Sequence, residues 1–102
     1  NKSGYKNAFV ILKELDEDDQ ATAKDYFYLG YIYQSGLCTE KNYYDAYKNY
    51  KKAANGNYPK AFYQIATLYR DGLGVNKSSE KSIESFKKSY DLGYKDSVTA
   101  LA

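Results

Sequence analysis

The feature that most constrains this chain is a segment that occurs twice, 36 positions apart. Leu29-Gly-Tyr-Ile-Tyr-Gln-Ser-Gly-Leu37 returns in altered form as Ile65-Ala-Thr-Leu-Tyr-Arg-Asp-Gly-Leu73. A fixed period of this size is typical of stacked arrays, in which no single unit buries its own apolar face. Such arrays generally act as binding surfaces. The repeat therefore indicates how the chain holds a partner, but not which partner.

The apolar residues predict that the array is built from helices. Within 5–15, the apolar residues at 5, 8, 9, 12 and 15 have the spacing of one face of an amphipathic helix. The four carboxylates of 16–19 would sit badly at the negative end of a helix dipole, so we expect them in the exit turn. Further helices are expected at 21–35, 43–54, 59–71 and 79–92, and a last one begins near 97.

Capping residues support these bounds. Gly36 and Gly72 are expected to end the first helix of each hairpin, because glycine adopts the left-handed conformation that a helix exit favours. Asn42 is the expected N-cap of the helix that begins at 43. After that helix, either Gly56 or Asn57 is expected to take a positive φ.

We expect one repeat domain over 1–102, in which each unit consists of a helix A followed by a helix B. Residues 1–20 form helix B of a preceding, irregular unit, 21–58 the first full unit, 59–94 the second, and 95–102 the start of a third. Solenoids generally need at least about 3 units for a continuous core. The array is therefore expected to continue at both ends or to pair with another molecule through its open ends.

The composition argues against an enzyme and against a metal site. The chain has no histidine, which is the commonest general base, and Cys38 is its single cysteine, so it has no thiol pair. The acidic run 16–19 lacks the spaced ligands, glycine and closing glutamate of a calcium loop. Gly72-Leu-Gly74 follows a predicted helix rather than a strand, so it does not indicate a phosphate loop. We expect no catalytic residue, no cofactor and no metal.

Charge and hydropathy argue against nucleic-acid binding and against a membrane span. Fifteen basic residues against 13 acidic residues leave a net charge of +2, too small and too dispersed to favour nucleic acid. No run approaches the roughly 20 apolar residues of a membrane span. Nothing in the sequence indicates the cellular compartment.

The second unit carries the pattern of a known family. It reads Ala61-x-Tyr63-x-Ile65-Ala66-x-x-Tyr69-x-x-Gly72-x-Gly74-Val75, followed by Phe86-Lys-Lys88 and Gly93. This pattern resembles the Sel1-like repeats, which are close relatives of the tetratricopeptide repeats. The first unit departs from it at Asp25, Cys38 and Asn57, and 5–15 aligns only with an insertion near the acidic turn.

The resemblance implies an all-α fold: a right-handed α/α superhelix, or solenoid, of helix-turn-helix hairpins. It also implies a protein-interaction scaffold, and we expect it to bind a peptide or protein segment on the concave face formed by the A helices. In this superfamily the A helices line the concave face.

Candidate binding residues follow from the geometry of helix A. Leu29, Gly30 and Tyr33 are expected in the core, so 24, 28, 31 and 35 fall on another stripe. Tyrosine combines contact area with a hydrogen bond at little entropy cost, which suits a peptide groove. The predicted partner-binding residues are Tyr28, Tyr31 and Ser35, with Gln64, Thr67 and Asp71 at the equivalent positions of the next unit.

Two other interpretations remain open at this point. In a chain with 14 tyrosines, an exposed ring can reflect composition alone, or fill a gap between hairpins. A purely structural role is the main alternative, in which the chain stacks on further repeats or on another copy without a ligand groove. Lys51-Lys52 and Lys87-Lys88 are expected on the solvated outer face of the B helices.

Overall fold

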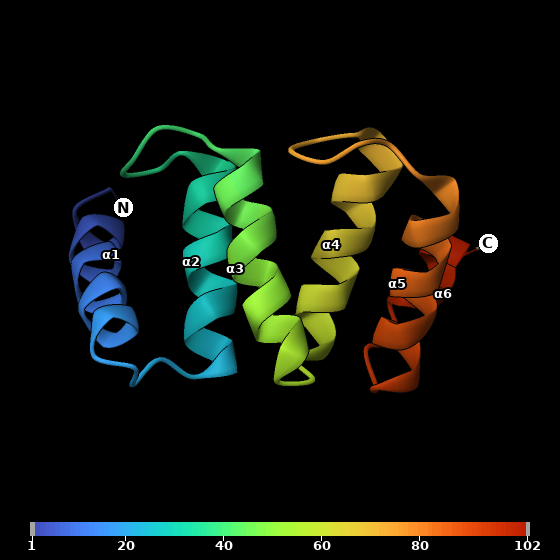
Figure 1. Ribbon diagram of the computed structural model, residues 1–102, viewed down its shortest axis with the longest axis horizontal. Helices are drawn as coiled ribbons and strands as arrows, with labels where there is room; N and C mark the ends of the chain where they lie inside the picture. Colours follow the sequence, from blue (N-terminus) through green and yellow to red (C-terminus); the bar gives the residue numbers. More distant parts are fainter. Residues whose placement is uncertain (1, 102) are drawn as a thin grey trace.

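The computed structural model describes residues 2–101, and this part of the chain forms six α-helices without a strand. The helices stand in a row in chain order, with α1 at one end and α5 and α6 at the other (Figure 1). The predicted all-α fold is confirmed; Ala102, expected in the last helix, lies outside the described residues. The bounds are α1 Lys2–Glu17, α2 Ala23–Ser35, α3 Tyr43–Asn55, α4 Pro59–Asp71, α5 Ser79–Asp91 and α6 Ser97–Leu101.

The end of α1 differs from the sequence prediction. The helix continues through Asp16 and Glu17, so the prediction that all four carboxylates lie in the exit turn is wrong. Asp16 is accommodated because its Oδ1 accepts a hydrogen bond of 2.8 Å from Tyr26 Oη. It also lies 4.0 Å from Lys52 Nζ. This hydrogen bond to the carboxylate is the main reason that the pKa of Tyr26 is raised.

The start of α2 is set by a capping box. Thr22 accepts a hydrogen bond from the Asp25 backbone, and the Asp25 side chain accepts one from the Thr22 backbone at 2.9 Å. Because this capping box satisfies the backbone N–H groups of both Thr22 and Asp25, the helix begins at Ala23 and not at 21.

Two equivalent loops fold α2 onto α3 and α4 onto α5. Gly36 and Gly72 take the left-handed conformation with φ of 66° and 68°, which confirms the predicted helix ends. Asn42 caps α3 as predicted, and its backbone N–H donates to the Tyr33 carbonyl at 2.9 Å. The equivalent hydrogen bond occurs 36 residues later in the second loop, where the backbone N–H of Ser78 donates to the Tyr69 carbonyl, also at 2.9 Å. The repeat in sequence is thus a repeat in hydrogen bonding.

The turns after the B helices show how α1 aligns with the array. Asn57 takes the positive φ of 60°, whereas Gly56 has a φ of −91°. Asp19 takes the same conformation after α1, and Gly93 takes a positive φ after α5. Asp19 precedes Asn57 by 38 positions, and Asn57 precedes Gly93 by 36. The connection between α1 and α2 therefore carries two additional residues.

The core lies between consecutive helices. Gly30 lies directly against the ring of Tyr50, which has no exposed surface. Tyr50 Oη donates to Gln34 Oε1 at 2.6 Å, and burial raises the pKa of Tyr50. The larger cluster of buried residues contains Ala46, Tyr50, Ala53, Ala54, Ala61, Ile65 and Leu68, and a smaller one between α1 and α2 contains Leu12, Leu29 and Ile32.

Candidate functional site

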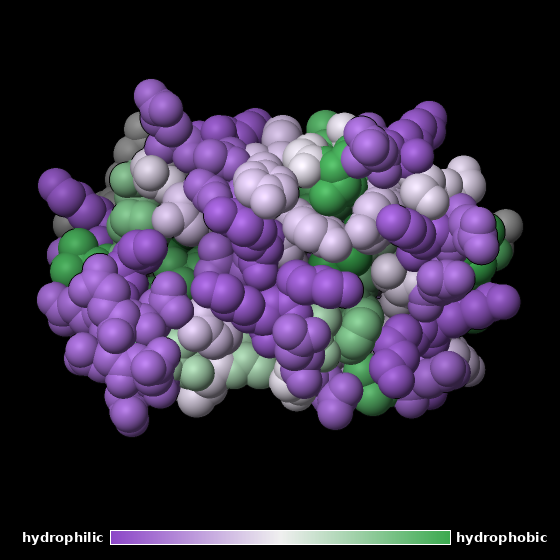
Figure 2. Space-filling model, viewed as in Figure 1, coloured by the Kyte–Doolittle hydropathy of each residue, from purple (hydrophilic) through white to green (hydrophobic). Residues whose placement is uncertain are grey.

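An open cleft of about 630 Å³ lies between α1 and α2. Both helices contribute apolar side chains at helical spacing, so their stripes face one another across it. Figure 2 shows one largely hydrophilic face of the molecule, with hydrophobic surface exposed near its α1 end and also over its middle and its opposite end. The lining residues are Gly4, Tyr5, Ala8, Ile11, Leu12 and Leu15 of α1, and Asp25, Tyr28, Tyr31 and Ile32 of α2.

Tyr28 and Tyr31 lie in the same cleft. Their side chains are 45% and 40% exposed, and Ile11 on the opposite wall is 57% exposed. Large apolar side chains that gather at one exposed place mark an interaction surface more often than scattered ones do. The structure thus brings together the two tyrosines that the sequence singled out.

Neighbouring rings and one lysine contact these tyrosines. The Tyr31 ring lies 6.4 Å from the Tyr5 ring, and the Tyr28 ring contacts the Phe27 ring edge-on at 5.9 Å. Lys24 Nζ lies 5.9 Å from the centre of the Tyr28 ring. These contacts limit the rotamers of both rings, so less entropy is lost when a partner binds.

The third predicted residue of α2, Ser35, does not line the cleft. It is half-buried, and its Oγ donates to the Tyr31 carbonyl at 2.7 Å. The hydroxyl therefore already bonds within its own helix, while its lone pairs remain available as acceptors. Contact between Ser35 and a partner stays a prediction.

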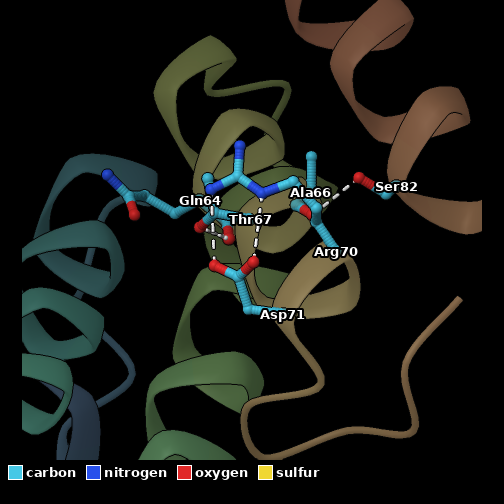
Figure 3. Close-up of polar contacts among 6 residues, drawn as sticks. All are labelled: Gln64, Ala66, Thr67, Arg70, Asp71 and Ser82. Atoms are coloured by element: carbon cyan, nitrogen blue, oxygen red, sulfur yellow. Dashed lines mark hydrogen bonds and ion pairs between the residues drawn. The ribbon is translucent and has the colours of Figure 1, made fainter. Parts of the chain in front are cut away.

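The three predicted residues of α4 also lie outside the cleft. Figure 3 shows their side chains on α4. Gln64 and Thr67 are half-buried, and Thr67 Oγ1 donates to the Gln64 carbonyl at 2.7 Å. Asp71 is exposed and accepts bonds of 3.2 and 3.3 Å from the guanidinium of Arg70, which raise the pKa of Arg70. In Figure 3 the Gln64 side chain extends toward α2. Their role in binding stays a prediction.

Sequence reasoning missed the α1 wall of the cleft. The signal was the run Ala8-Phe-Val-Ile-Leu12, whose five consecutive apolar residues are more than one helical stripe requires. Two of them, Val10 and Ile11, are exposed in the structure.

A second, more polar cleft of about 360 Å³ lies among α3, α4 and α5. At its wall the hydroxyls of Tyr47 and Tyr69 lie 2.9 Å apart. Burial, followed by this hydrogen bond, raises the pKa of Tyr47 to about 12. Lys51, which the sequence placed on the outer face, lines this cleft and is exposed.

The described residues show neither a group of metal ligands nor a helix long and apolar enough to cross a membrane. Cys38 lies in the loop after α2, where its Sγ is 3.4 Å from the Tyr5 carbonyl. The arrangement offers a contact surface of aromatic and aliphatic groups.

Comparison with known proteins gives two kinds of match. Residues 23–58 and 59–94 each match the sequence profile of the Sel1 repeat. The fold is similar to a Sel1 repeat protein from Oxalobacter formigenes, with a TM-score of 0.78 and 23% identity, covering 95% of this chain and 43% of that one. It is also similar to the cysteine rich protein B of Helicobacter pylori, with a TM-score of 0.79 and 24% identity, covering 90% of this chain and 68% of that one.

These likenesses support an α/α solenoid. The chain spans less than half of the Oxalobacter protein. No curated protein matches the sequence.

Proposed function

Because the chain belongs to the Sel1 repeat family, we propose that it is a scaffold that binds a protein or peptide segment in the cleft between α1 and α2. Sel1 repeats are generally protein–protein interaction modules, and proteins built from them are typically non-catalytic. The observation that carries the proposal is the apolar cleft of about 630 Å³ with Tyr28 and Tyr31 partly exposed in its wall.

The two tyrosines supply affinity in this proposal. Each ring has apolar surface left to bury, and tyrosine is enriched among the few residues that dominate binding energy. Ser35, Gln64, Thr67 and Asp71 are proposed to extend the contact beyond the cleft. Their polar groups would set the register of the bound segment.

The test begins with a pull-down from the source cell to identify the partner. Its affinity is then measured for the wild type and for Tyr28→Ala/Tyr31→Ala. We expect at least tenfold weaker binding, about 1.4 kcal/mol, with an unchanged helical circular dichroism signal.

Tyr44→Ala/Tyr90→Ala is the matched control. Both control tyrosines are exposed on the helix surface, and neither lines the cleft. A loss of binding in the control pair but not in the cleft pair would show that the cleft is not the binding site.

A structural role is the second candidate, and the exposed apolar residues at both ends favour it. Val10 and Ile11 are exposed on α1, and Val98 is exposed on α6. Stacking on further repeats or on another copy would cover these side chains. Light scattering and a melting temperature that rises with concentration would support self-association, whereas a stable monomer would count against it.

A further inference from the structure

The junction of α1 with α2 repeats the junction of α3 with α4. The rings of Phe9 and Tyr33 meet edge-on at 5.6 Å and 86°, and the rings of Tyr47 and Tyr69 meet at 5.7 Å and 79°. The loops make equivalent approaches as well. Cys38 Sγ lies on the Tyr5 carbonyl, and 36 residues later Gly74 lies against the backbone of α3 at Tyr43 and Tyr44. Helix α1 therefore stands to α2 as α3 stands to α4.

In the second junction, a helix occupies the space that corresponds to the cleft. On α3 the residues Ala46, Tyr50 and Ala53 are fully buried. Helix α2 covers this face, since Gly30 lies on the Tyr50 ring and Gly56, just after α3, lies on Ala23. The cleft beside α1 therefore corresponds to the space that α2 fills beside α3.

The α1 residues that lie 38 positions before Ala46, Tyr50 and Ala53 line the cleft. They are Ala8, Leu12 and Leu15. On the other wall, Tyr28 and Tyr31 correspond to Gln64 and Thr67, 36 positions later. Gln64 and Thr67 are half-buried on α4. The Gln64 side chain extends toward α2 (Figure 3). The α1 wall of the cleft thus matches a surface of α3 that α2 covers. On the other wall, Gln64, the equivalent of Tyr28, extends toward the same helix α2.

We propose that the cleft receives an amphipathic α-helix of the partner, in the position that α2 takes against α3. This inference rests on the proposed function and specifies the partner's structure. The seated helix runs parallel to α2 and antiparallel to α1, as α2 and α4 run parallel to each other (Figure 1). It presents alanine or glycine over Leu12, as Gly30 does over Tyr50.

Charge defines which end of the seated helix carries basic residues. The C-terminus of α1 and the N-terminus of α2 lie at the same end of the α1–α2 pair (Figure 1). The cleft lies between these two helices. Asp16 is bonded to Tyr26, while Glu17, Asp18 and Asp19 are exposed at this end. A helix parallel to α2 brings its positive N-terminal dipole toward these carboxylates. The partner helix is therefore expected to carry lysine or arginine in its first turn.

A probe peptide can be taken from the chain itself. Residues 59–71 form a helix A that already carries alanine, Ala66, at the crossing position. Two lysines are added before Pro59, and an i,i+4 lactam on the outer face keeps the peptide helical, because isolated helices of this length are marginal. Fluorescence anisotropy measures its binding to the full chain. We expect saturable binding that Ile11→Lys weakens at least tenfold.

The matched control is Ile83→Lys, which changes an isoleucine of similar exposure on α5, outside the cleft, and should leave binding unchanged. Replacing Ile65 of the probe by proline without the lactam should abolish binding, since proline breaks the helix. Moving the two lysines to the C-terminus of the probe should weaken binding several-fold.

Three results would overturn the inference. Equal binding of the proline peptide would show that the site takes an extended segment. No saturable binding of the helical probe, while Tyr28→Ala/Tyr31→Ala still weakens the native partner, would refute the helical seat and leave the proposed function standing. Self-association that Ile11→Lys abolishes would assign the cleft to a second copy of the chain.

Discussion

Replacing Gly30 by alanine tests the helix crossing on which the proposed helical seat is based. A Cβ at position 30 would lie 2.6 Å from both Cδ1 and Cε1 of Tyr50. Carbon atoms at van der Waals contact are about 3.5–4.0 Å apart, so either the ring or the helix must move. The Tyr50 ring has little room, because it is fully buried, contacts Phe27 at 5.5 Å and is hydrogen-bonded to Gln34.

Two opposing effects set the magnitude of the change. Overpacking a core costs about 1–3 kcal/mol. Alanine in place of glycine inside a helix gains about 1 kcal/mol. With two ring atoms in severe overlap we expect the upper part of the overpacking range, and so a net loss of about 2 kcal/mol in the free energy of unfolding.

Urea denaturation of Gly30→Ala, Tyr50→Leu and the double variant measures the coupling. In the Tyr50→Leu background the ring is absent, so Gly30→Ala should cost little or become stabilising. Equal destabilisation in both backgrounds, or no loss in the wild-type background, would refute the close crossing of α2 over α3.

Three further predictions concern stability. Gly72→Val should cost about 1–3 kcal/mol in a thermal melt, because valine is strained at a φ of 68°; an unchanged melt would contradict the loop assignment. The pKa of Tyr47 is raised from 10.0 to about 12 in the fold, so its contribution to stability should be complete below pH 10 and lost as pH rises toward 12. Tyr47→Phe should remove that part of the alkaline pH dependence of the free energy of unfolding. A pH profile identical to that of the wild type would contradict this prediction. Ser97 Oγ is buried without a hydrogen-bond partner among the described residues, so Ser97→Ala should be neutral or stabilise by about 1 kcal/mol, and a clear loss in urea would disagree.

The periodic part of the fold could be predicted from sequence because it depends on local chemistry. Gly36 and Gly72 need a left-handed φ, Asn42 caps the next helix, and Asn57 replaces glycine at a positive φ. Each of these choices is dictated within a few residues of the chain. The 36-residue period and these local signals therefore predicted the bounds of both hairpins to within a few residues.

The candidate site was only half predictable, because positions that are equivalent in sequence have different neighbours. Tyr28 and Gln64 occupy the same place on helix A. Tyr28 faces an open cleft, whereas Gln64 is half-buried and extends toward α2. The wall formed by Ile11 and Leu12 went unrecognised because α1 matches the array at 38 residues rather than 36.

Nuclear magnetic resonance mapping, with the partner segment that the pull-down identifies, tests whether the cleft between α1 and α2 is the binding site. Amide chemical shifts of the labelled chain would be followed while the segment is added. We expect the largest changes on both walls of the cleft, at Ala8 and Ile11 of α1 and at Tyr28 and Tyr31 of α2. Changes confined to the lysine-bearing face of α3 and α5, at Lys52 and Lys87, with the cleft unaffected, would contradict it.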